Sequence, residues 1–173
     1  MIDQSGLVVF RCHDVWDNFP EFGVRDSWRE GLDLKGEIVA DEYPCYVTRI
    51  EPVRLGELAR HILGRLKPLG QNGLLVSGDQ ERVVATIATG TGVSTNPIWT
   101  HDLGAGVSVI SNDYYLRVRM GAHAEELGIP TIMVDHGVSE EWGIENLARY
   151  LTNEFDELEV VHIPYRCGFQ VVC

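Results

Sequence analysis

Two residues four positions apart point to metal chemistry in the second half of the chain. In the stretch VDHGVSEEWG an apolar run ends at Asp135 and is followed by His136 and Glu140. If Ser139 caps a helix that begins there, Glu140 lies in the first turn and can fold back toward His136. One imidazole and one carboxylate then face the same space, which is the beginning of a divalent-metal site.

A second group of polar residues follows the apolar run at the start of the chain. The stretch RCHDVWD places His13, Asp14 and Asp17 directly after GLVVF at residues 6–10. One carboxylate from this stretch completes a mixed nitrogen and oxygen ligand set with the imidazole and carboxylate of the first stretch, and Asp17 is the natural third member. Such a set suits Zn, Mn, Fe or a similar divalent ion.

A third polar stretch, SNDYY, contains Asp113 after another apolar run. In α/β sheets, ligands bind just past the carboxyl ends of strands, because loops converge there and the amino ends of helices point at the ligand. All three polar stretches are predicted to follow strands in this way. Asp113 is therefore a third candidate position for chemistry.

The same residues also have plain structural explanations. A single histidine at the end of a strand is more often hydrogen-bonded in place than bound to metal, and the helix dipole favours acidic residues in a first turn. The glycine-rich stretch TGTGVSTN at residues 89–96 matches neither the Walker nor the dinucleotide-binding pattern, so a turn is predicted there. His101 and Asp102 precede two glycines and also indicate a turn. Spacing alone leaves a metal site and a structural role both open.

Short apolar runs alternate with helical patterns along the chain. Strands are predicted within residues 6–10, 73–78, 83–90, 106–113, 129–135 and 158–164, and helices within residues 53–66, 114–128 and 144–151. Residues 36–54 fit neither pattern. The alternation in the second half predicts an α/β layered domain with a mixed, largely parallel sheet flanked by helices.

The composition is typical of one globular domain. The 173 residues are 45% hydrophobic and 23% charged, which is enough to bury a core. Acidic residues number 26 against 14 Lys and Arg, so the net charge of -12 argues against nucleic acid or anionic lipid and favours cations. The 4 cysteines show no C-x-x-C spacing, and no leader or bilayer-spanning run is evident. We expect a single cytoplasmic domain over residues 1–173, with no nucleic-acid or membrane partner.

The histidine-containing stretches resemble the Nif-three-like dinuclear metal centre proteins, also known as GTP cyclohydrolase I type 2 homologues. VVFRCHDVWDNFPEFGVRDSW is similar to that family's H-T-N-L-D segment, and VDHGVSEEWG to its G-H-x-x-S-E motif. The resemblance implies that Asp17, His136 and Glu140 are metal ligands. It also implies that His13 is a nearby active-site residue. The stretch ISND is similar to the family's I-T-G-[DE] stretch, which implies that Asp113 lines the same cleft.

The sequence also departs from the family pattern. The family's H-H-P or H-E-P motif, which lies well upstream and supplies the first ligands, is absent, so the chain corresponds to the carboxyl-terminal two-thirds of a family member. Asp135 and Asn112 stand where the family usually has glycine. One ion held by Asp17, His136 and Glu140 is expected, because three ligands and water satisfy a catalytic geometry.

The resemblance implies metal-assisted hydrolysis. Paired ions bridged by a carboxylate would activate water on a nucleotide or phosphoester-type substrate, with His13 or Asp113 available for proton transfer. It also implies a homo-oligomer, commonly a hexamer. A second hypothesis is a non-catalytic metal-binding or regulatory interaction protein, and a third is a folded core without metal.

Overall fold

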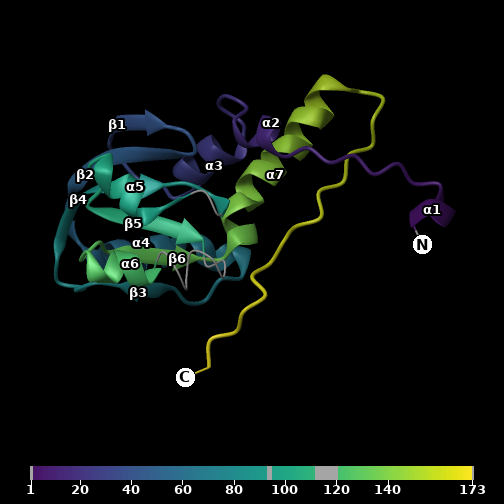
Figure 1. The fold of residues 1–173 in the computed structure, drawn as a ribbon. Helices are drawn as coiled ribbons and strands as arrows, with labels where there is room; N and C mark the ends of the chain where they lie inside the picture. Colours follow the sequence, from purple (N-terminus) through teal and green to yellow (C-terminus); the bar gives the residue numbers. More distant parts are fainter. Residues whose placement is uncertain (1, 93–94, 112–120, 173) are drawn as a thin grey trace.

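The centre of the molecule is a mixed six-stranded sheet with helices packed on it (Figure 1). The structure is a computed structural model, and it describes residues 2–92, 95–111 and 121–172. The strands are β1 (Glu37–Glu42), β2 (Cys45–Arg54), β3 (Leu75–Ser77), β4 (Val83–Thr89), β5 (Val107–Ser111) and β6 (Thr131–Val134). They lie in the order β1-β2-β4-β5-β6-β3. The predicted α/β class with a mixed sheet is confirmed, but the sheet is not largely parallel, because three of the five pairs between the described strands are antiparallel.

The parallel part of the sheet is its centre. Strand β5 pairs in parallel with β4 on one side and with β6 on the other. Antiparallel pairs flank this centre, since β1 pairs with β2, β2 with β4, and β3 with β6. The carboxyl ends of β4, β5 and β6 therefore meet at one edge of the sheet, and the loops that leave these ends can share a site.

Residues 36–54, which fitted no pattern in the sequence, form a hairpin. Strand β1 runs antiparallel to β2, and Glu42 pairs with Cys45 across the turn. Strand β1 is a mostly exposed edge strand with acidic residues, which is a common protection against further pairing. An edge strand of this kind buries neither face fully, so its sequence carries little hydrophobic alternation.

The larger helices cover one face of the sheet and enclose the main core. They are α3 (Val24–Gly31), α4 (Leu55–Leu66) and α7 (His136–Glu154). The core joins helix residues to strand residues, including Trp28, Leu32, Ile62, Ile87, Val109 and Ile132. Helix α4 was predicted from its apolar spacing, and that spacing is the buried stripe that faces the sheet.

Shorter helices lie elsewhere on the molecule. They are α1 (Ile2–Ser5), α2 (Asp14–Asp17), the 3-10 helix η1 (Lys67–Leu69), α5 (Pro97–Asp102) and α6 (Gly121–Glu126). Helix α5 is joined to β5 by a hydrogen bond between the buried hydroxyls of Thr100 and Ser108. Gly128, with φ +67°, follows α6, which agrees with the predicted end of that helix. None of the helices that the structure describes combines the length and apolar composition needed to span a bilayer.

Two segments that were predicted as strands lie outside the sheet. Residues 6–10 and 158–164 belong to no strand. Figure 1 shows the first segment leaving the body of the molecule, whereas the second lies beside α7, where His162 Nε2 is 3.2 Å from Glu141 Oε1. Val8 and Ile163 are 94% and 84% exposed. Both strand predictions were wrong, because a segment rich in strand-forming residues becomes a strand only when another strand pairs with it. Among the described residues, no strand pairs with either segment.

Candidate metal centre

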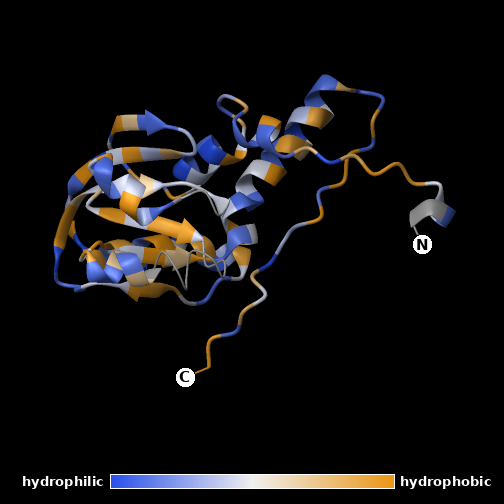
Figure 2. Cartoon of the chain, viewed as in Figure 1, coloured by the Kyte–Doolittle hydropathy of each residue, from blue (hydrophilic) through white to orange (hydrophobic). Residues whose placement is uncertain are grey.

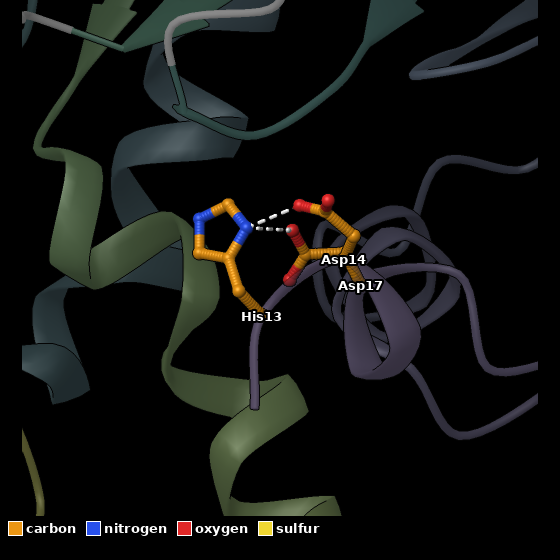
Figure 3. Close-up of side chains that lie close together, drawn as sticks. All are labelled: His13, Asp14 and Asp17. Carbon is orange, nitrogen blue, oxygen red and sulfur yellow. Dashed lines mark hydrogen bonds and ion pairs between the residues drawn. The ribbon is translucent and has the colours of Figure 1, made fainter. Parts of the chain in front are cut away.

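Helix α2 and the residue before it gather three potential metal ligands. Figure 3 shows the side chains of His13, Asp14 and Asp17 converging. The Nδ1 atom of His13 lies 2.5 Å from Oδ1 of Asp14 and 3.7 Å from Oδ2 of Asp17. One ligand atom from each residue lies within 4.8 Å of the others. One imidazole and two carboxylates are donor types that a divalent ion takes in proteins.

Trp16 positions this helix against α7. Its side chain is buried, and its Nε1 donates a hydrogen bond of 2.9 Å to the carbonyl of Gly143 in α7. Its ring stacks on Phe19 and lies beside Tyr150, with centroid distances of 5.0 Å and 5.8 Å. Asp17 follows Trp16 directly, so the docked indole holds the Asp17 carboxylate close to α7.

Strand β6 and helix α7 place the second pair of candidate ligands. His136 Nε2 lies 2.8 Å from Glu140 Oε1, as expected for residues one helical turn apart. The helix is capped by Asp135, whose buried carboxylate accepts a hydrogen bond of 3.0 Å from Val138 N. The prediction that Ser139 caps this helix was wrong, since Ser139 lies inside it and donates to the His136 carbonyl. Helical periodicity therefore brings the imidazole and carboxylate together, and no fold-back is needed.

Asp17 connects the two groups electrostatically. Burial raises the pKa of the Asp17 carboxyl above its usual value, the His13 imidazole opposes this shift, and the charge of Glu140 adds to it. His136 also acts on Asp17, in the same direction as His13. Carboxylates gathered in a partly buried place repel one another, and a cation would relieve that repulsion.

His13 is held as a stronger base than an isolated imidazole. Its hydrogen bond to Asp14 raises the pKa of His13 above 6.5, and the charges of Asp17 and Asp14 add to the shift. The side chain is 61% exposed, so solvent and small molecules can reach it. A basic and accessible imidazole beside carboxylates can take up a proton during a reaction.

Gly92 forms a wall of this site that the sequence interpretation missed. Its φ is +62°, and a Cβ there would lie 3.1 Å from His136 Nε2. Ser111, at the end of β5, donates a hydrogen bond of 3.0 Å to the Gly92 carbonyl. The stretch 89–96 was read as a turn, although a second glycine just after a central strand was a usable signal. The neighbouring candidate Asp113 lies outside the described residues.

The structure brings the predicted residues together in two groups. His13 and Asp17 lie with Asp14, which the sequence interpretation named but did not select as a ligand. His136 and Glu140 form the other group. Within residues 2–92, 95–111 and 121–172, the compact three-ligand group contains neither residue of the second pair. One ion shared by Asp17, His136 and Glu140 therefore stays a prediction.

Comparison with known proteins identifies the family. The model of the Duf34/NIF3 (NGG1p interacting factor 3) family matches residues 2–167. The chain belongs to the NIF3 family. No curated protein matches its sequence. The matched range contains the residues of both groups of candidate ligands and all six strands of the sheet.

Solved structures share the fold of this NIF3-family chain. The protein ybgI, of unknown function, is 25% identical with a TM-score of 0.68 over 88% of this chain and 60% of its own. TTHA1606 from Thermus thermophilus is 19% identical with a TM-score of 0.66, over 96% and 64% of the two chains. A Bacillus cereus protein related to NIF3 is 21% identical with a TM-score of 0.59, over 74% and 35%. The chain thus spans less than two thirds of these relatives.

Proposed function

We propose that this NIF3-family chain is a metal-dependent, hydrolase-like protein that acts on a nucleotide or phosphoester-type substrate. The observation that carries the proposal is the position of Asp17, which lies in the compact group on α2 and also responds to the charges of the pair on α7. Together the two groups offer three carboxylates and two imidazoles. That donor set suits Zn, Mn or Fe.

The residues divide into those that hold an ion and those that move a proton. Asp17, His136 and Glu140 would hold a divalent ion, with Asp14 as a further carboxylate beside them. A bound ion of this class lowers the pKa of a water molecule and orients a substrate oxygen. His13 would accept the proton from that water, and its contact with Asp14 would stabilise the charged imidazole that results.

The open position of two donors favours a second candidate function. His13 is 61% exposed and Asp14 is 81% exposed, whereas catalytic sites generally exclude water around the reacting groups. A non-catalytic metal-binding or regulatory interaction protein would tolerate such exposure. The two candidates share metal binding and differ in turnover, so one series of measurements separates them.

The test begins with metal content. The purified 173-residue protein would be loaded with Mn or Zn, dialysed and analysed for bound metal, together with the variant Asp17→Asn. The matched control is Asp102→Asn, because Asp102 also lies beside a histidine, 4.0 Å from His101 Nδ1, but outside the candidate centre. We expect the wild type and the control to retain metal and Asp17→Asn to lose most of it.

Turnover is then measured on nucleotides and simple phosphoesters with the same three proteins. Metal-dependent hydrolysis by the wild type and the control, lost in Asp17→Asn, would support the hydrolase. Metal retention without any turnover would leave the binding or regulatory function. Absence of retained metal in the wild type would contradict both, as would equal retention in Asp17→Asn.

A further inference from the structure

The C-terminal strap, residues 162–167, crosses the first turns of α7 and reaches the body beside η1. Figure 2 shows both hydrophilic and hydrophobic residues along it. The amide of Cys167 donates a hydrogen bond of 3.4 Å to the Leu69 carbonyl, and the Cys167 side chain packs on the main core. The guanidinium of Arg166 donates a hydrogen bond of 3.2 Å to the Pro68 carbonyl. One end of the strap is therefore fixed to the body.

A buried carboxylate of α7 binds the other part of the strap. Glu141 is 4% exposed, and burying a charged group is unfavourable unless it is paired. Its Oε2 accepts a hydrogen bond of 2.9 Å from the amide of Tyr165, and its Oε1 lies 3.2 Å from Nε2 of His162. Both carboxylate oxygens thus contact the strap, which fixes residues 162–165 on the helix.

The ring of Tyr165 lies against the first turn of α7. A Cβ on Gly137 would lie 2.5 Å from Cε1 of that ring, so a residue without a side chain leaves the space that the ring occupies. Burial raises the pKa of the Tyr165 hydroxyl, and the charge of Asp135 and a hydrogen bond to it add to the shift. Since Asp135 caps α7, Tyr165 lies at both the cap and the first turn.

The strap meets α7 next to the candidate metal ligands. Successive residues of an α-helix are turned by about 100° around its axis. His136 and Glu140 therefore form one stripe along α7, and Gly137 and Glu141, which the strap contacts, form the neighbouring stripe. On the other side of the ligand stripe, Gly143 packs closely against α3. The ligand stripe is thus bounded by α3 on one side and by the strap on the other.

We propose that Tyr165 is a positioning residue of the candidate metal centre, and that the C-terminal strap keeps the ligand stripe of α7 directed at the ion. The ends of helices fray readily, and the ring against Gly137 opposes fraying of the turn that carries His136. Residues around a metal site that orient its ligands typically change metal affinity by about 10–100-fold when they are replaced. This inference rests on the proposed metal-dependent function.

Titration of the complete protein with Mn or Zn tests the role of the ring. Tyr165→Ala removes the ring and keeps the amide that donates to Glu141, so the dissociation constant for metal should rise about 10-fold. The matched control is Phe169→Ala, which removes an aromatic ring from the chain just beyond the strap. Phe169 lines a cavity with Leu74 and Met133. The control should bind metal like the wild type.

The glycine beneath the ring gives a second variant. Gly137→Ala should favour the helix itself, because alanine is a better helix former than glycine, but its Cβ would displace the Tyr165 ring. Gly64→Ala is the matched control, since Gly64 lies in α4 and a Cβ there meets no atom within 4 Å. Only Gly137→Ala should lose metal affinity, again about 10-fold. The double variant of Gly137→Ala with Tyr165→Ala should lose no more than either single variant, because all three remove the same contact.

Circular dichroism would establish that every variant is folded under the conditions of the titration. Weaker metal binding in both variants of the contact, with both controls unchanged, supports the positioning role. Equal affinity of Tyr165→Ala and Phe169→Ala would overturn it, and so would losses that multiply in the double variant. A wild type that binds no metal would instead contradict the proposed function, and this inference with it.

Discussion

The two halves of the candidate centre are held in the fold in different ways. The pair on α7 stands at the start of a 19-residue helix that follows a buried strand and is capped by the buried Asp135. The group on α2 stands on a four-residue helix that follows an exposed segment. Only Trp16 is buried in that short helix. One half is therefore part of the core, and the other is docked onto it.

This difference determines how much of the binding energy of an ion is used to order each half of the centre. The backbone amide of Asp135 donates a hydrogen bond of 3.1 Å to Gln71 Oε1, so the start of α7 is fixed to a second segment as well as to β6. The α7 half is already ordered, so binding an ion there requires little further ordering. The α2 half keeps more freedom, and fixing it consumes part of the binding energy. Metal affinity should therefore depend most on what anchors α2.

The largest expected effect comes from removing that anchor. Trp16→Ala would empty a buried site between α2 and α7 and delete the hydrogen bond to the Gly143 carbonyl. The free energy of unfolding should fall by about 3–5 kcal/mol. Metal affinity should fall as well, because Asp17 loses its placement while the pair on α7 keeps its own. Urea unfolding and a metal titration below the unfolding transition would measure the two effects.

Trp142→Ala is the matched control for this change. Trp142 also projects from α7, but it packs on Trp28 of α3 at a centroid distance of 5.6 Å and has no described contact with α2. Its removal should lower stability without changing metal affinity. If Trp16→Ala bound metal as tightly as Trp142→Ala, the α2 half would not depend on its anchor, and the contrast between the halves would be lost.

A smaller effect is expected from the wall of the α7 half. Gly92→Ala would place a Cβ 3.1 Å from His136 Nε2, which is closer than an ordinary van der Waals contact, and would force alanine into a left-handed backbone conformation. The conformation alone should lower the free energy of unfolding by about 1–2 kcal/mol. The added methyl should also weaken metal binding, because it approaches the nitrogen that would face the ion.

Gly104→Ala separates these two contributions. Gly104 has φ +88°, and a Cβ there meets no atom within 4 Å. The control therefore carries the backbone strain without the contact to His136. Both variants should lose similar stability in urea unfolding, and only Gly92→Ala should lose metal affinity. Identical titrations of the two variants would mean that His136 does not face the ion.

The same contrast explains which features could be predicted from the sequence. Helix α4 and the three central strands follow from hydrophobic periodicity, because they are buried among their neighbours. The contact of His136 with Glu140 follows from helical spacing. Residues 6–10 carry a similar pattern, yet they form no strand in the described structure, since pairing depends on a partner that the sequence of the segment does not specify.

The details of the site were harder to predict for a related reason. The sequence interpretation assigned the helix cap to Ser139, whereas the structure has Asp135 as the cap. Residue spacing does not decide which of two nearby side chains accepts the hydrogen bond from a free backbone amide. Gly92 became part of the site only when the end of β4 was placed beside α7. Both features depend on packing between segments that are distant in the sequence.

The smallest expected effect tests whether a change in the packing of α3, the helix beside the α7 half, leaves metal binding unaffected. Tyr46 of β2 donates a hydrogen bond of 2.5 Å to Asp26 Oδ1 of α3, the helix that packs on α7. Burial and this hydrogen bond raise the pKa of Tyr46 to about 12. Because the pKa in the folded state is the higher one, this stabilisation is complete below about pH 10 and is lost as the pH rises toward 12.

Between about pH 8 and pH 10.5 the loss from this group should be on the order of 1 kcal/mol or less. Tyr46→Phe cannot ionise, so the stability difference between the wild type and Tyr46→Phe should shrink over this range, as measured by urea unfolding at each pH. Tyr43→Phe, at an exposed tyrosine in the hairpin turn, controls for general alkaline effects. Metal affinity at neutral pH should be the same in all three proteins, because Tyr46 supports α3 without touching either half. A weaker affinity in Tyr46→Phe would show that the α7 half is not rigidly held, which would reverse the contrast between the halves.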